Sequence, residues 1–214
     1  MRAGHVEPCP RRVRAERHGK VVVRTDAAQY LWEHDHFPAF YLPEADVDLD
    51  GIDPAALRRD DALPGHVRIA WDAVDHWFEE DTEVFKHPVD PYHRVDVREA
   101  SRRVQVLVDG VVVAESSRPK LLFETGLPTR YYLPWADVRT DLLAPTATSS
   151  VCPYKGQAHY WAVTVGGATY PDLVWGYRYP VPEAAGIAGC VCFYNERVDL
   201  VVDGIALDRP VTPF

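Results

Sequence analysis

Short segments in which apolar and polar residues alternate recur along this chain, separated by turn residues. A period of two, with many β-branched and aromatic side chains, is typical of half-buried strands. Strands are predicted in the second half at 103–108, 111–115, 120–124, 158–165, 173–179, 189–194 and 197–202, and in the first half at 20–24, 29–33, 66–71 and 92–97. Asp109-Gly110 and Asp203-Gly204 are hairpin signals.

Helical patterns are short. They cover residues 54–60, 73–80 and 135–142. Strands at this spacing, without long amphipathic helices between them, favour antiparallel over parallel sheets. The sequence therefore predicts an all-β fold of small antiparallel barrel-like or sandwich-like domains with short helical turns.

An internal repeat sets the domain organisation. Residues 13–47 align without a gap with residues 104–138, an offset of 91 positions (104 − 13 = 91). Matched pairs include Glu33 with Glu124 and Tyr41 with Tyr132. A fixed period over so many positions indicates one structural unit made twice. We expect an extension at 1–12, a first repeat at 13–100 and a second repeat at 101–214, with the boundary near Ala100.

Charge and length exclude several classes of protein. The 214 residues fit two domains of about 100 residues each. A formal net charge of −9 argues against nucleic acid as a partner, because that affinity depends on cationic side chains. No apolar run approaches the ~18 residues of a membrane span, and the N-terminus lacks the apolar segment of a secretory signal. We expect a cytoplasmic protein with reduced cysteines.

One block in the second repeat carries a family resemblance. Cys152-Pro153-Tyr154-Lys155-Gly156 is preceded by Leu133-Pro134 and followed by Trp175-Gly176-Tyr177 and a strand ending at Val202-Asp203-Gly204. With the repeat, this resembles the domain-of-unknown-function 427 family, and residues 87–97 look like the connector of its two-copy bacterial members. The resemblance implies a small all-β domain and brings no established activity. The nucleotide-binding patterns GxGxxG and GxxxxGK[ST] are absent.

The two repeats differ where chemistry is expected. The first has Leu63-Pro64-Gly65-His66 in place of the block around Lys155, with no lysine or cysteine. Because packing tolerates substitutions that a reactive site does not, the second repeat is the better candidate. Lys155 would lie in a tight turn among aromatic rings, where a partly desolvated amine suits a nucleophile or a general acid or base. Alternatively, it is a surface lysine that stabilises the turn.

Further candidates surround Lys155. Glu124 would exchange protons with the lysine or orient a substrate, although Glu33 at the matching position favours a structural role. Tyr177 would contribute a hydroxyl, and Cys152 a thiolate, unless Cys152 is simply a small buried residue. Aromatic and histidine side chains would line the ligand pocket: Tyr132, Tyr154, His159, Trp161 and Trp175.

Metal sites are disfavoured. Cys190 and Cys192 lie on the same face of one predicted strand, and with Cys152 and His159 they could form a tetrahedral zinc site. Structural zinc sites usually contain CxxC pairs, which are absent here, so core packing is favoured. The triplet His34-Asp35-His36 lies in a predicted loop. We expect neither a metal nor another cofactor.

The sequence thus favours a protein that acts on a small organic molecule in an aromatic pocket of the second repeat, using Lys155 and Glu124. Two alternatives stay open. One is a non-catalytic module that binds a small molecule in the same pocket. The other is an interaction or scaffold protein that uses the acidic first repeat as its contact surface. We expect Lys155 to affect function more than stability, because the first repeat completes its fold without it.

Overall fold

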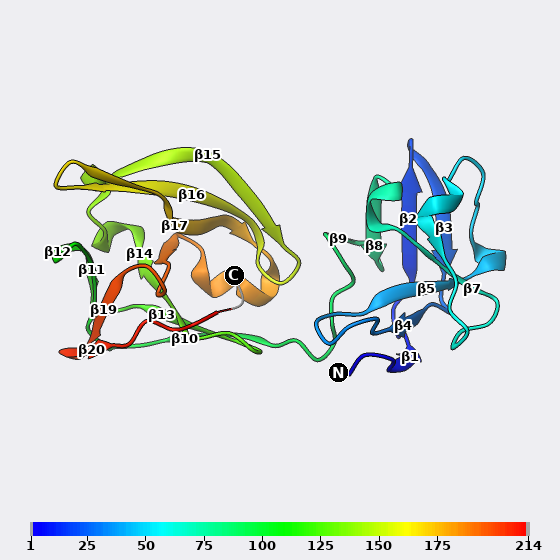
Figure 1. The fold of residues 1–214 in the computed structure, drawn as a ribbon, viewed down its shortest axis with the longest axis horizontal. Coiled ribbons are helices and arrows are strands. Elements are labelled where there is room, and N and C mark those ends of the chain that lie inside the picture. Colours follow the sequence, from blue (N-terminus) through cyan, green and yellow to red (C-terminus); the bar gives the residue numbers. More distant parts are fainter. Residues whose placement is uncertain (1, 213–214) are drawn as a thin grey trace. The chain divides into compact units, whose positions relative to one another are not determined.

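The computed structural model describes residues 2–212 and forms two compact units, Met1–Tyr92 and His93–Phe214 (Figure 1). The division falls before Ala100 because residues 95–99 form a strand of the second unit. Each unit pairs two antiparallel sheets, so the all-β prediction is confirmed, with open sandwiches rather than closed barrels.

The first unit contains a five-stranded and a four-stranded sheet. The larger has the order β1-β4-β5-β7-β6: β1 Val6–Pro8, β4 Gln29–Leu31, β5 Ala39–Pro43, β7 His66–Ile69, β6 Leu57–Arg58. The smaller has the order β3-β2-β8-β9: β3 Lys20–Thr25, β2 Val13–Arg17, β8 His76–Glu79, β9 Thr82–Val84. Short 3-10 helices connect them: η1 Glu44–Asp46, η2 Pro54–Ala56, η3 Trp71–Ala73.

The second unit enlarges the same plan. Its seven-stranded sheet has the order β10-β13-β14-β18-β17-β16-β15: β10 Val95–Glu99, β13 Lys120–Glu124, β14 Arg130–Pro134, β18 Cys190–Phe193, β17 Ala168–Pro180, β16 Gly156–Val165, β15 Leu143–Cys152. The four-stranded sheet has the order β12-β11-β19-β20: β12 Val111–Ser116, β11 Val104–Val108, β19 Asp199–Val202, β20 Ile205–Leu207. The 3-10 helices are η4 Trp135–Asp137, η5 Thr140–Leu142 and η6 Pro182–Ile187.

Strand register shows that the repeat is structural. Gln29 pairs with Tyr41 in the first unit, and Lys120 pairs with Tyr132 in the second. The correspondence also reaches further toward the N-terminus than residue 13, because β1 lies beside β4 in the register that β10 has beside β13. The predicted hairpins form as well, with positive φ at both Asp109 and Gly110.

Alternation along the strands produces two buried layers in the second unit. One apolar cluster fills the space between its two sheets and includes Val106, Val163 and Phe193. The other lies on the opposite face of the large sheet under η6, and we call it the aromatic cluster. Its buried members are Leu122, Tyr132, Ala158, Trp175, Tyr177, Ala184, Ile187, Cys190 and Cys192. The seven-stranded sheet is therefore covered on both faces.

Two sequence-based assignments were wrong. Residues 73–80, predicted as a short helical segment, instead contain strand β8, whose Trp77 is buried in the first core. Residues 92–97, assigned to the first repeat, overlap β10 of the second.

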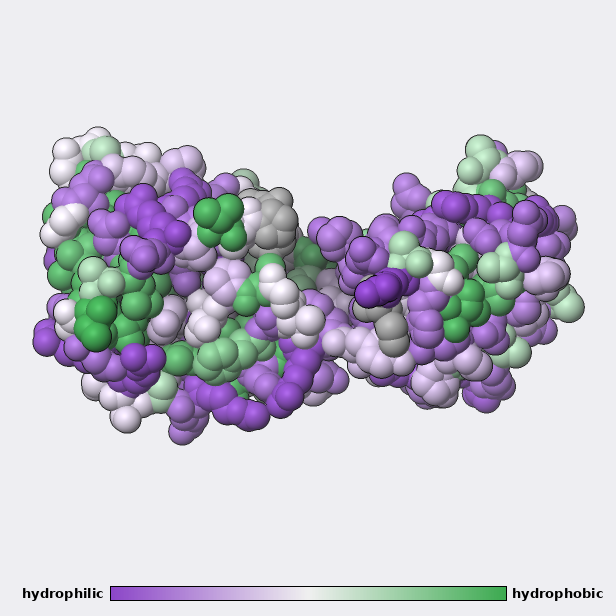
Figure 2. Space-filling model, turned by 60° about the horizontal axis from the view of Figure 1, so that its bottom comes forward, coloured by the Kyte–Doolittle hydropathy of each residue, from purple (hydrophilic) through white to green (hydrophobic). Residues whose placement is uncertain are grey.

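On the face shown in Figure 2, hydrophilic residues predominate and apolar residues occupy separate areas.

Candidate functional site

Lys155 and Glu124 come together in the second unit, and His93 joins them. The Lys155 ammonium donates to Glu124 Oε2, and His93 Nε2 lies 3.0 Å from Glu124 Oε1. The side chain of Glu124 is 4% exposed, that of Lys155 11% and that of His93 16%. We call these three residues the charged network. Its carboxylate is shared between two nitrogen groups that come from different parts of the chain.

Local backbone geometry holds Lys155 in place. It ends the turn between β15 and β16, where its amide donates to the Cys152 carbonyl at 3.2 Å and its own carbonyl accepts from the Val181 amide at 3.2 Å. Gly156 follows with φ +99°, and a Cβ there would lie 3.1 Å from the Tyr179 carbonyl oxygen. Only glycine meets both demands. The sequence around Lys155 therefore fixes the turn that directs the ammonium to the sheet.

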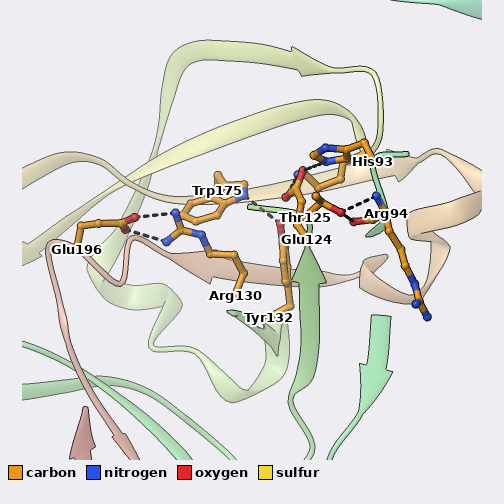
Figure 3. A network of polar contacts seen from close by, with 9 residues as sticks. His93, Arg94, Glu124, Thr125, Arg130, Tyr132, Trp175 and Glu196 are labelled. Atoms are coloured by element: carbon orange, nitrogen blue, oxygen red, sulfur yellow. Dashed lines mark hydrogen bonds and ion pairs between the residues drawn. The ribbon is translucent and has the colours of Figure 1, made fainter. Parts of the chain in front are cut away.

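His93 is the site residue that sequence reasoning missed. It precedes β10, which pairs with β13 so that Val95 lies opposite Glu124. The Arg94 amide donates to Thr125 Oγ1 at 2.9 Å, which fastens this segment beside Glu124 (Figure 3). Tyr154 stacks on the His93 ring at 4.0 Å. Extending the repeat to β10 would have placed this segment at the edge of the sheet, next to Glu124.

The charged network keeps its carboxylate ionised. Burial alone would raise the pKa of Glu124, but the hydrogen bond from His93 and the charge of Lys155 outweigh it and lower that pKa. The sequence left two alternatives for Lys155, a partly desolvated amine among aromatic rings and a surface lysine. The structure buries Lys155 beside the buried Glu124 carboxylate, and because removing one partner of a buried pair is costly, we expect a larger contribution to stability than the sequence suggested.

Aromatic rings extend inward from this network. Trp175 Nε1 donates to the Tyr132 hydroxyl at 3.1 Å (Figure 3). The Tyr194 ring lies 4.5 Å from that of Trp175. Burial raises the pKa of both Tyr132 and Tyr177, so these phenols stay neutral. Of the candidates named from sequence, Tyr132, Tyr154, Trp175 and Tyr177 therefore share the neighbourhood of the charged network or its adjoining cluster.

A second buried ion pair lies at the other side of Trp175. Both Nη atoms of Arg130 donate to the Glu196 carboxylate, at 2.8 and 2.7 Å. The Arg130 guanidinium is also 5.5 Å from the centre of a Trp175 ring, within the range of a cation–π contact (Figure 3). The aromatic cluster thus has fixed charges at two ends.

Two predicted ligand contacts lie elsewhere. Trp161 packs against the core between the sheets and lies 5.1 Å from Trp135. His159 shares its side of β16, because alternate residues of a strand face the same way. Tyr160 faces the aromatic cluster instead, and its hydroxyl lies 2.7 Å from Ser150 Oγ.

The cysteines give no metal centre. Cys152 is half-buried at the end of β15, while Cys190 and Cys192 belong to the aromatic cluster, and all are free thiols. Burial raises the pKa of Cys192 to about 12, which disfavours the thiolate that zinc requires. Within residues 2–212, no group of three or more histidine, cysteine or acidic side chains is arranged to hold a metal ion.

Comparison with known proteins confirms the family. Residues 5–68 and 96–204 match the family described as Domain of unknown function (DUF427). The chain belongs to the DUF427 family. No curated protein matches it. The matches begin at residues 5 and 96, again 91 positions apart (96 − 5 = 91), so each structural unit carries one DUF427 segment. Among the described residues, no helix is long and apolar enough to cross a membrane.

The first DUF427 repeat shows what is common to both copies. Glu33, at the position of Glu124, accepts from the Tyr41 hydroxyl at 2.8 Å and from Arg68 Nη1 at 2.7 Å. A glutamate at the end of this strand thus binds a cationic side chain in both DUF427 repeats. Lys155 and its histidine partner distinguish the second repeat.

Proposed function

We propose that the second repeat acts on a small organic molecule bound beside Lys155 and Glu124. The observation that supports this most directly is the charged network itself, held against the aromatic cluster. Burying charged groups is costly, and well-packed apolar residues are often as stabilising. The first repeat has no counterpart of strands β15 and β16, so it forms its sheets without the turn that carries Lys155. Leu63-Pro64-Gly65-His66, matched to that turn from the sequence, instead leads into β7, the counterpart of β18.

The chemistry of the network suits a ligand with a carbonyl or carboxylate oxygen and an apolar body. The Lys155 ammonium would bind that oxygen. It has three donor hydrogens, and one of them is directed to Glu124 Oε2 in the structure. Tyr154 and the rings of the aromatic cluster would contact the apolar part. The pKa of Glu124 is lowered by its two neighbours, and buried ionisable groups with a perturbed pKa are frequent at functional sites.

Proton transfer is the reaction step that this geometry favours. Glu124 contacts both His93 and Lys155, so the carboxylate would stabilise the positive charge that either nitrogen group gains when it accepts a proton from the bound molecule. His93 or Lys155 would act as general acid or base on the bound molecule. Cys152 and Tyr177 would contribute only if the ligand reached past the turn to β17.

The experiment uses a defined mixture of organic acids, aldehydes and ketones that carry a ring or a branched apolar group. Binding is measured by the shift in unfolding temperature, and consumption of each compound by liquid chromatography with mass spectrometry. Lys155→Arg keeps the charge but changes the donor geometry, and Lys20→Met is the control, because Lys20 is an exposed lysine on β3 of the first repeat.

Consumption that is lost in Lys155→Arg and kept in Lys20→Met would support an enzyme. Binding without consumption, again dependent on Lys155, would support the alternative of a non-catalytic binding module. If the parent protein neither binds nor consumes any compound, the proposal fails. The acidic first repeat would then be tested as a surface for a protein partner.

A further inference from the structure

The first repeat contains a pocket of its own. Its volume is about 60 Å³, room for on the order of four to six water molecules, so it would admit the edge of one small ring or a branched group without enclosing it. Phe40, Ile69 and Trp77 form its buried floor. All lining residues lie between Glu33 and Pro88, so the pocket is built by the first unit alone.

Aromatic rings form the pocket walls. Trp71 stacks on Trp77 with ring centres 5.1 Å apart, and Phe37 stacks on His87 at 3.8 Å with only 8° between the planes. His87 Nδ1 donates to the Pro88 carbonyl at 2.8 Å, which fixes the orientation of that ring. Aromatic faces of this kind favour a flat apolar group, because a ring can stack against them.

Cationic side chains lie at the rim. Two cationic side chains, Arg68 and Lys86, line the pocket, together with one carboxylate, that of Glu33. That carboxylate is already neutralised, since Glu33 Oε2 lies 2.7 Å from Arg68 and 3.5 Å from Arg58. Lys86 is exposed, and no carboxylate of residues 2–212 forms an ion pair with it. The rim therefore carries an unneutralised positive charge in a chain whose net charge is −9.

We propose that the first repeat binds a small planar carboxylate, such as an aromatic or unsaturated acid. The ring would enter between the Phe37 and Trp71 walls, and the carboxylate would face Lys86 and Arg68. A cationic ligand would be repelled by the same two side chains, although the aromatic walls alone would accept it. This site is separate from the charged network of the second repeat.

The probe is benzoate, titrated into the full-length protein by calorimetry and followed by the indole N–H signals of Trp71 and Trp77 in NMR spectra. Benzyl alcohol and benzylamine have the same ring with a neutral or a positive group. Lys86→Met removes the rim charge at an exposed position, and Lys20→Met is the matched control in the same repeat.

We expect one benzoate per chain, bound at least about tenfold more tightly than benzyl alcohol, and weakened about fivefold by Lys86→Met, as for the loss of one partly exposed charge contact. Lys20→Met and Lys155→Met should leave the affinity unchanged. Three results would overturn the proposal: no saturable binding at millimolar benzoate, binding of benzylamine at least as tight, or binding that Lys155→Met abolishes. The last would assign benzoate to the second repeat and leave the proposal for that repeat standing.

Discussion

The ammonium of Lys155, on the turn between β15 and β16, neutralises the carboxylate of Glu124 on β13. Lys155→Met should destabilise the protein by about 1–3 kcal/mol, since Glu124 is 4% exposed and would keep only His93 as a partner. Urea unfolding measures this. Lys20→Met, at an exposed site, should change stability by less than about 0.5 kcal/mol. Equal stability of Lys155→Met and the parent would mean that the ion pair does not form in solution.

The residue scale is where sequence reasoning succeeded in part. Lys155 was selected because the repeats differ there, Glu124 was named as its partner although Glu33 matches it, and the two side chains do meet. The contribution of His93 was missed because the repeat was not extended to β10, which lies beside β13. His159 was named as a residue that would line the ligand pocket. Because successive residues of β16 point to opposite faces of the sheet, Tyr160 and not His159 lies toward the aromatic cluster.

Acid should weaken the network through Glu124. Its pKa is lower in the folded protein than in the unfolded chain, so its contribution is complete above the ordinary glutamate pKa and is lost as the pH falls through the folded value. Glu124→Gln should therefore reduce the free energy of unfolding most near about pH 7 and progressively less below about pH 4.5.

The measurement is a series of urea unfolding curves across that range of pH. Glu183→Gln is the control, because Glu183 is an exposed carboxylate on η6 of the same unit. A difference between Glu124→Gln and the parent that stays constant with pH would contradict the lowered pKa of Glu124.

At the scale of elements, the turn that carries Lys155 depends on Gly156. Gly156→Ala should cost about 2 kcal/mol or more, because φ is +99° and the added methyl would meet the Tyr179 carbonyl oxygen. Gly167→Ala is matched, with φ +84° and open space around its Cβ, and should cost only about 1 kcal/mol. Thermal unfolding compares the two variants. Equal losses would show that the close approach to Tyr179 does not contribute.

Elements with a strong local signal were predictable, and those without one were not. The strand at 120–124 matches β13, and the Asp-Gly hairpins form as expected. β15 was missed because it is an edge strand of small polar residues, mostly exposed, with no apolar alternation. β8 was predicted as a helical segment, whereas pairing with β2 and burial of Trp77 decide its conformation.

For the whole molecule, two separate cores predict two independent folding units. Residues 1–92 and 93–214, expressed as separate chains, should each show a cooperative thermal transition and a strand-rich circular dichroism spectrum. The larger fragment should also keep the loss of stability on Lys155→Met, since the charged network lies within it. A fragment that is unfolded alone would show that its own core is insufficient.

The extra strands β15 and β16 lie at one edge of the larger sheet, after the order β10-β13-β14-β18-β17 that mirrors β1-β4-β5-β7-β6. Two antiparallel strands return the chain to the direction in which it left, so an insertion of even number preserves every later strand orientation. An insertion of one strand would reverse them all. The repeats can therefore differ by a whole hairpin at this edge and keep the same topology. The hairpin of β15 and β16, with the Lys155 turn at its tip, could therefore be inserted or deleted as one unit without changing the direction of the other strands.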